Sequence, residues 1–158
     1  MKPGHDLKRL VTGCALLMLL PPAAGARCMM GGGCMGMMGG HSARHGYYMR
    51  HGLPADYAGR TNPLPATSGN IEAGRQLFER NCAACHGAGG RGDGPGAKGL
   101  NPPPSDLARA GRRPMMSDAF FYWAIAEGGV AFGTAMPAWK ASLKETEIWQ
   151  LVLYLRTL

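Results

Sequence analysis

The chain has 158 residues, of which 46% are hydrophobic and only 17% are charged, and a formal net charge of +7. No apolar run reaches the ~18 to 20 residues that a membrane span needs, which argues against an integral membrane protein. Residues 27–70 hold 10 of the 25 glycines, whereas the last 40 residues have an ordinary helical composition. We therefore expect one domain over 70–158, small enough to need a metal, a disulfide or a cofactor for stability.

The basic charge does not indicate a nucleic-acid partner. The isoelectric point is near 9.5, but lysines and arginines form no run interleaved with aromatic residues. Arg109, Arg112 and Arg113 make a weakly basic group. That group is compatible with an acidic protein partner and, equally, with a solvated loop.

The first residues have the pattern of a targeting segment. Three basic residues precede an apolar stretch, Leu10–Leu20, and Ala24–Ala26 supplies the small residues of a cleavage site. We expect residues 1–26 to be a cleaved secretory signal, which makes the mature chain periplasmic, without a transmembrane segment, and able to keep disulfides. The alternative is a lipoprotein signal, because Val11–Cys14 resembles a lipid-attachment box; it precedes the apolar run, however, instead of following it.

Residues 27–51 are unusually rich in soft metal ligands and glycine. Thiolates and thioethers select Cu(I), and imidazoles accept Cu(II), so a copper site is one interpretation. Its ligands would be Cys28, Met29, Met30, Cys34, Met35, Met37, Met38, His41 and His45. A flexible tail with a Cys28–Cys34 disulfide, or a segment that docks on a partner, are the alternatives. Residues 52–69 are rich in Pro, Gly, Ser and Thr and are predicted to be a linker.

One motif carries specific chemistry, namely Cys82-Ala-Ala-Cys85-His86. Two thiols three residues apart, followed directly by a histidine, form the attachment signature for a covalent haem, whose iron the histidine ligates. A zinc ribbon needs a second pair of ligands, and no Cys or His follows His86. A thioredoxin-type pair needs a βαβ context, and no alternating strand pattern surrounds these residues. We therefore predict one haem c.

The remaining elements of the domain are predicted to be helices. Residues 71–81 form an amphipathic helix in which Gly74 indicates close contact with another helix. Residues 118–127 form an aromatic helix beside the haem. A capping box of Ser142 and Glu145 starts the terminal helix, which presents an apolar face. That face consists of Ile148, Leu151, Val152 and Leu155. The predicted fold class is all-α.

These features together resemble the class I c-type cytochromes over residues 70–158. Gly74 and Phe78 match the glycine and aromatic positions of that family's first helix, and Leu151 and Tyr154 match the helix that crosses it. Gly133–Trp139 (GTAMPAW) is similar to the family's distal segment. The resemblance implies a cytochrome c helical bundle around one haem, with a methionine as the sixth iron ligand.

The resemblance also implies a proline carbonyl that accepts the other N–H of the proximal imidazole and so fixes its orientation. Pro103 and Pro104 are the leading candidates, and Pro95 stays open as a third. These prolines follow the glycine-rich turn after His86.

Three methionines follow the attachment motif, and Met136 is the predicted ligand. It lies in a glycine-rich loop that ends at a proline, where the backbone can approach the haem closely. Met115 and Met116 precede a helix start and are expected to pack against the haem edge instead.

His86 and Met136 together would leave no open coordination position, and the domain shows no acid/base pair or nucleophile arrangement. We therefore expect no enzyme but a periplasmic one-electron carrier, which would shuttle electrons between a donor (a dehydrogenase or membrane complex) and an oxidase or reductase. One alternative is the haem subunit of a periplasmic oxidoreductase complex. Another is a copper-handling protein that uses residues 27–51. A gas sensor is the least favoured interpretation, because it requires Met136 to leave the iron readily.

Overall fold

The computed structural model describes residues 43–158, and this part of the chain is helical, without strands. The α-helices are α1 (Ala43–His51), α2 (Ser68–Asn81), α3 (Ala83–His86), α4 (Leu107–Gly111), α5 (Asp118–Glu127) and α6 (Glu145–Leu155). Two 3-10 turns, η2 (Pro95–Ala97) and η3 (Val130–Phe132), lie in the connections. The all-α prediction is therefore confirmed for these residues, and none of their helices is long and apolar enough to cross a bilayer.

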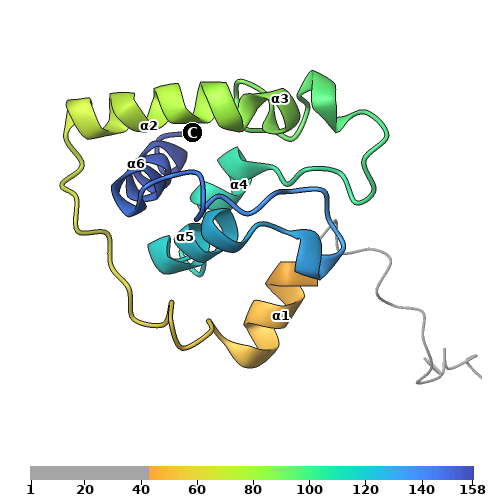
Figure 1. The fold of residues 1–158 in the computed structure, drawn as a ribbon, viewed down its shortest axis with the longest axis horizontal. Helices are drawn as coiled ribbons and strands as arrows, with labels where there is room; N and C mark the ends of the chain where they lie inside the picture. The colour runs from red at the N-terminus through yellow and green to blue at the C-terminus, as the bar shows by residue number, and fades with distance from the viewer. Residues whose placement is uncertain (1–42) are drawn as a thin grey trace, which may run out of the picture. The chain divides into compact units, whose positions relative to one another are not determined.

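Helices α2 and α6 cross in direct backbone contact at Gly74, as the sequence predicts. A Cβ atom placed on Gly74 would lie 2.0 Å from the carbonyl oxygen of Gln150 and 3.0 Å from the Cβ of Tyr154. The ring of Tyr154 packs on Phe78, with ring centroids 5.3 Å apart. Figure 1 shows the two helices side by side at one side of the molecule. Only glycine permits this approach, which explains a residue that otherwise weakens a helix.

Helix α5 is the centre of the core and has the predicted bounds, 118–127. Ser117 caps it by accepting a hydrogen bond from the Phe120 N–H (3.2 Å). Seven of its ten residues are buried, so the helix is apolar almost all round, as expected of one enclosed by other elements. Tyr122 packs on Trp149 of α6, with ring centroids 4.3 Å apart.

The N-terminal part of the described chain differs from the sequence prediction. Residues 43–51, expected to belong to the tail, form helix α1, which lies on the far side of α5 from α2 (Figure 1). Tyr47 and Tyr48 pack against the core, and the ring of Tyr48 lies 4.9 Å from that of Phe120. These aromatic contacts hold the helix even though the segment around it is rich in glycine.

The predicted linker, residues 52–69, is also packed against the core. Leu53, Tyr57 and Leu64 are half-buried on it. The side-chain amide of Asn62 donates to the Trp149 carbonyl oxygen at 3.1 Å. The folded domain therefore begins well before residue 70, because apolar and amide side chains of this segment contact the core.

The terminal helix begins two residues later than the Ser142 cap predicts, because its N-cap is Lys144 and not Ser142. The Lys144 N–H donates to the Glu147 carboxylate at 2.7 Å. The Ser142 N–H instead donates to the Trp139 carbonyl oxygen at 2.9 Å, in a preceding turn. Ser142 and Leu143, which the local pattern assigned to the start of the helix, are instead part of the turn that follows Trp139.

Candidate functional site

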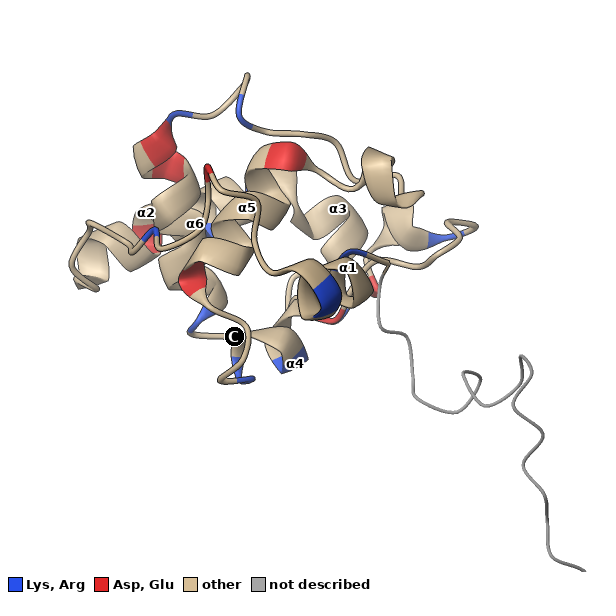
Figure 2. Cartoon of the chain, turned by 90° about the horizontal axis from the view of Figure 1, so that it is seen from below, with Lys and Arg blue, Asp and Glu red and all other residues tan. Residues whose placement is uncertain are grey.

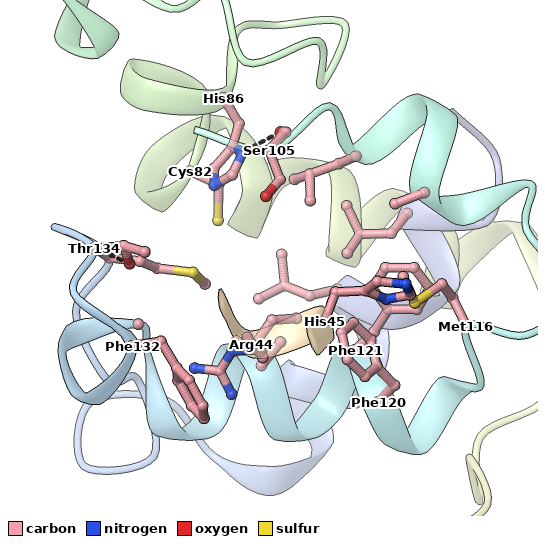
Figure 3. Close-up of a pocket in the computed structure, with 18 of the residues that line it drawn as sticks. Arg44, His45, Cys82, His86, Ser105, Met116, Phe120, Phe121, Phe132 and Thr134 are labelled. Carbon is pink, nitrogen blue, oxygen red and sulfur yellow. Dashed lines mark hydrogen bonds between the residues drawn. The ribbon is translucent and has the colours of Figure 1, made fainter. Parts of the chain in front are cut away.

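The attachment motif lies on a tight helical turn that continues from α2. The Cys82 N–H donates to the Phe78 carbonyl oxygen (2.8 Å), and the His86 N–H donates to the Cys82 carbonyl oxygen (2.9 Å). Cys82 and Cys85 are both free thiols. In Figure 3 the sulfur of Cys82 and the ring of His86 extend into the same space. The backbone therefore holds all three motif residues beside one cavity.

The orientation of His86 is fixed by a main-chain carbonyl. Its Nδ1 lies 3.0 Å from the carbonyl oxygen of Ser105 (dashed line in Figure 3). A carbonyl oxygen can only accept, so Nδ1 carries the hydrogen and Nε2 keeps its lone pair for a metal. The acceptor is thus the residue after the predicted Pro103 and Pro104, and the proline assignment is wrong. The prolines restrict the backbone of this segment, and the resulting path brings the Ser105 carbonyl, not a proline carbonyl, to the imidazole of His86.

Glycines after His86 allow the chain to turn back over the motif. A Cβ on Gly94 would lie 2.4 Å from the Ala84 carbonyl oxygen, and one on Gly92, whose φ is +81°, would lie 2.4 Å from the Pro104 carbonyl oxygen. The Gly92 N–H donates to the His86 carbonyl oxygen at 2.8 Å. This loop therefore brings the 104–105 backbone to the imidazole, a role that its composition alone does not reveal.

Two adjoining cavities open beside the motif. The inner one has a volume of about 140 Å³ and mostly apolar walls. The outer one has about 570 Å³, within the ~300 to 1,000 Å³ range of sites that bind organic cofactors. Both are lined by Cys82, His86, Ser105, Thr134 and Met136. These shared walls make them parts of one crevice between the attachment motif and the segment that carries Met136.

Met136 lines both cavities, and its segment is held in place by a backbone hydrogen bond. Its carbonyl oxygen accepts from the Gly129 N–H at 2.8 Å, which ties the loop to the end of α5. A Cβ on Gly128, whose φ is +62°, would lie 2.4 Å from the backbone of Pro137 and Ala138. Glycine at this position therefore lets the Met136 segment close on the helix.

Burial governs the ionisation of both motif groups. It raises the pKa of the Cys82 thiol to about 12, with a smaller contribution from Cys85. A thiol of that kind is protonated at neutral pH and unlike the activated thiolates of redox enzymes. Burial also lowers the pKa of His86, opposed by the bond to Ser105. His86 is consequently a neutral imidazole, the form that binds metals.

The other predicted contacts are divided between the two cavities and the surface. Pro103 and Pro104 line the outer cavity. Met116 is buried and lines the inner cavity with Phe120 and Phe121, whereas Met115 is 52% exposed. A haem-edge contact is therefore supported by the position of Met116 and not by that of Met115.

Two residues of helix α1 line the inner cavity although the sequence analysis assigned them to the tail. Arg44 and His45 are both buried there (Figure 3). His45, which was also predicted as a copper ligand, is buried in the wall of this cavity. The other predicted copper ligands, at positions 28 to 41, lie outside the described residues. The signal that could have identified α1 is its aromatic pair, Tyr47 and Tyr48.

The site fits a covalently attached haem. The crevice joins two free thiols, a neutral histidine and a methionine thioether, and its inner walls are aromatic and aliphatic. Within residues 43–158 no group of three or more His, Cys, Asp and Glu side chains is arranged to hold a metal ion. The donor set is thus one nitrogen and one thioether sulfur that line the same crevice, which suits an iron whose other four ligands come from a macrocycle.

Two known proteins are similar to parts of this chain. A curated relative, the Cbb3-type cytochrome c oxidase subunit FixPc of Rhizobium leguminosarum bv. viciae, is 32% identical over 106 residues, which cover 63% of this chain and 31% of the relative. A chain of the Kuenenia stuttgartiensis reducing HAO-like protein complex is 28% identical with a TM-score of 0.53, over 70% of this chain and 53% of that one. This chain thus spans about a third and about half of the two proteins' lengths.

The family comparison covers more than half of the chain. Residues 69–155 match the family described as cytochrome C oxidase, cbb3-type, subunit III. The matched segment runs from the second residue of α2 to the end of α6 and includes the attachment motif and Met136. The chain therefore belongs to the cytochrome c family of cbb3-type oxidase subunit III.

Proposed function

We propose that the chain transfers single electrons through one haem c, attached at Cys82 and Cys85 and ligated by His86 and Met136. The observation that carries the proposal is that His86 and Met136 line the same two cavities. His86 is oriented by the Ser105 carbonyl, and the Met136 segment is tied to the end of α5 by the Gly129 N–H. Haem c supplies a one-electron iron couple when it is bound.

The protein's own residues do three things in this proposal. Ser105 holds the imidazole in the tautomer that presents Nε2 to the metal. Phe120, Phe121 and neighbouring apolar side chains exclude water from the inner wall. Met136 would supply the second protein ligand to the iron, so that no coordination site would remain for a substrate. Two ligands held by the backbone need little rearrangement when the charge of the metal changes.

Redox proteins are the proposed partners, and the compartment is the periplasm, reached through the predicted signal at residues 1–26. A free carrier is one form of this function. The haem subunit of an oxidase or oxidoreductase complex is the other, and it is favoured by the relatives, whose names denote an oxidase subunit and a protein complex. Basic residues of α4 and the following turn lie beside the C-terminus (Figure 2), where Arg112 donates to the Leu158 carbonyl oxygen at 3.0 Å. They are candidates for contact with an acidic partner.

The ligand assignment is tested by Met136→Ala in the full chain, produced by an export route that attaches haem c. We expect the haem to stay attached, the sulfur-to-iron charge-transfer band at the red end of the spectrum to disappear, and the reduction potential to fall. Met115→Ala is the matched control, because Met115 is exposed, and it should change neither property. A Met136→Ala protein that keeps the band would refute the assignment.

The electron-transfer proposal itself is tested on the unaltered protein. We expect a coloured, low-spin protein that cycles reversibly between two oxidation states and does not bind carbon monoxide rapidly when ferrous. A colourless product would refute it. Purification from a native source in a stable complex with an oxidase or reductase would favour the subunit form over the free carrier.

A further inference from the structure

Arg44 of helix α1 is a buried cation in the wall of the haem crevice. Its exposed fraction is only 6%. The guanidinium carbon lies 4.4 Å from the ring centroid of Trp123 and 4.6 Å from that of Phe132. Figure 3 shows the guanidinium beside Phe132. These ring faces attract the positive charge but accept no directed hydrogen bonds from the ends of the side chain.

The two terminal nitrogens of Arg44 are buried and have no hydrogen-bond partner. Burying a charged group without partners costs several kcal/mol, so such a group indicates a ligand of opposite charge. Burial lowers the pKa of Arg44 to about 10, which still leaves it charged at neutral pH. The nearby Glu127 carboxylate accepts from the Tyr57 hydroxyl and, at 2.9 Å, from Lys140, and it makes no bond to Arg44.

The lining of the crevice that Arg44 faces is complementary to an amphipathic ligand. Most of the inner wall is apolar, and the guanidinium is the group on it that offers several strong donors. A haem has the matching pattern, because an apolar macrocycle carries two propionate carboxylates at one edge. Arg109 lines the outer cavity, but its side chain is exposed to solvent, whereas that of Arg44 is buried.

We infer that Arg44 donates a charge-assisted hydrogen bond to a haem propionate, and that α1 is thereby part of the haem site. The inference rests on the proposed function. It adds an element that the family match does not include, since α1 ends at His51 and the match begins at residue 69. Arginine suits the role because its planar fork pairs with carboxylates.

The variant that tests this is Arg44→Met in the haem-loaded full chain, because methionine keeps an apolar stem against Trp123 and Phe132. A cation beside the haem favours the reduced state. Its loss should lower the equilibrium constant for reduction about tenfold, which for one electron is about 59 mV in midpoint potential. We also expect a shift of the propionate bending band in the resonance Raman spectrum. Arg44→Lys, which keeps the charge, should retain most of the potential.

Arg50→Gln is the matched control, because Arg50 is an exposed arginine of the same helix, and it should change neither readout. A second measurement needs no variant. In the diamagnetic ferrous protein, slowly exchanging Nη–H signals of Arg44 should show contacts to the propionate methylene protons. This spectrum decides the matter if Arg44→Met does not fold or load haem.

The outcomes separate this inference from the proposed function. Absence of those NMR contacts, or an unchanged potential and Raman band in Arg44→Met, would overturn the role of Arg44 alone. A protein that carries no haem would overturn the proposed function and this inference with it.

Discussion

Helix α2 and helix α1 are attached to the same core in opposite ways. Helix α2 meets α6 backbone to backbone at Gly74, where no side chain fits between them. Helix α1 is held by side chains alone, through aromatic contacts of Tyr47 and Tyr48 and the stacked guanidinium of Arg44. Backbone atoms in direct contact cannot move apart without shifting a helix, whereas a side-chain contact can be weakened locally. We therefore expect the α2–α6 contact to determine whether the protein folds, and the α1 contacts to affect only the surroundings of the crevice.

The most damaging change should be Gly74→Ala. The new methyl group would meet the Gln150 carbonyl, a backbone atom that cannot move aside without shifting α6. We expect a loss of about 3 kcal/mol or more in the free energy of unfolding, or no folded protein at all. Denaturant unfolding followed by circular dichroism measures it.

Gly69→Ala is the matched control within α2. No atom lies within 4 Å of the corresponding Cβ position, so alanine should stabilise the helix by about 0.5 kcal/mol. Equal effects of the two substitutions would show that the α2–α6 contact is looser than the structure indicates.

A smaller and local effect is expected from Tyr47→Ala. The Tyr47 ring contacts Phe132 and Trp123, with centroids 5.6 and 6.0 Å away. Its loss should cost about 2 kcal/mol, and amide hydrogen exchange should accelerate in α1 while α2 and α6 stay protected. Met49→Ala on the same helix, at a side chain that is 57% exposed, should leave exchange unchanged. Uniform acceleration throughout the chain would instead show that α1 unfolds only with the core.

The connector between α1 and α2 should contribute to the free energy of unfolding in a pH-dependent way, through the hydrogen bond of Tyr57 to Glu127. The Tyr57 hydroxyl and Lys140 both donate to Glu127 and lower the pKa of that carboxyl group. Stability from a lowered pKa is fully present above the ordinary value for glutamate, about 4.3, and is lost as the pH falls through the folded value.

Glu127→Gln should therefore cost about 1 kcal/mol at pH 7 and remove that acid-dependent loss. Urea unfolding at neutral and acidic pH measures both. Glu145→Gln is the control: this carboxylate is 62% exposed and pairs with Arg60 at 3.0 Å, so its loss should cost less than about 0.5 kcal/mol. Identical pH profiles for wild type and Glu127→Gln would contradict the role of this cluster.

The smallest predicted effect concerns the start of α6. Glu147→Ala removes the acceptor for the Lys144 N–H and should cost about 0.5 to 1 kcal/mol. Ser142→Ala should have almost no effect, because Ser142 lies in the preceding turn. If Ser142→Ala lowers the thermal stability more than Glu147→Ala, Ser142 is the N-cap residue, as the local pattern predicts.

Several features of the site follow from local chemistry and were predicted on that basis. The 118–127 helix depends on residues within one turn of each other, and so does the Ser117 cap that the structure adds. The close approach at Gly74 follows from the cost of glycine in a helix. The haem motif is equally local, since one helical turn places two thiols and a histidine together.

Other features depend on how distant segments meet. The choice of Ser105 over Pro103 or Pro104 as partner of His86 is set by a loop 19 residues away in sequence, whose path glycines at 92 and 94 determine. Helix α1 was missed because glycine and methionine dominate the composition around it. Its tyrosines stabilise the helix only through contacts with Phe120 and Phe132, which are distant in the sequence.

By itself, the sequence determined the all-α class of the described residues, the position of the attachment motif and the glycine at the helix crossing, because each depends on the stereochemistry of neighbouring residues. The tertiary structure alone decided which carbonyl orients His86 and which cation faces the crevice. Those contacts join segments whose separation along the chain carries no information about their distance in space. Arg44 is the clearest case, since an arginine in a glycine-rich segment has no local feature that marks it as buried.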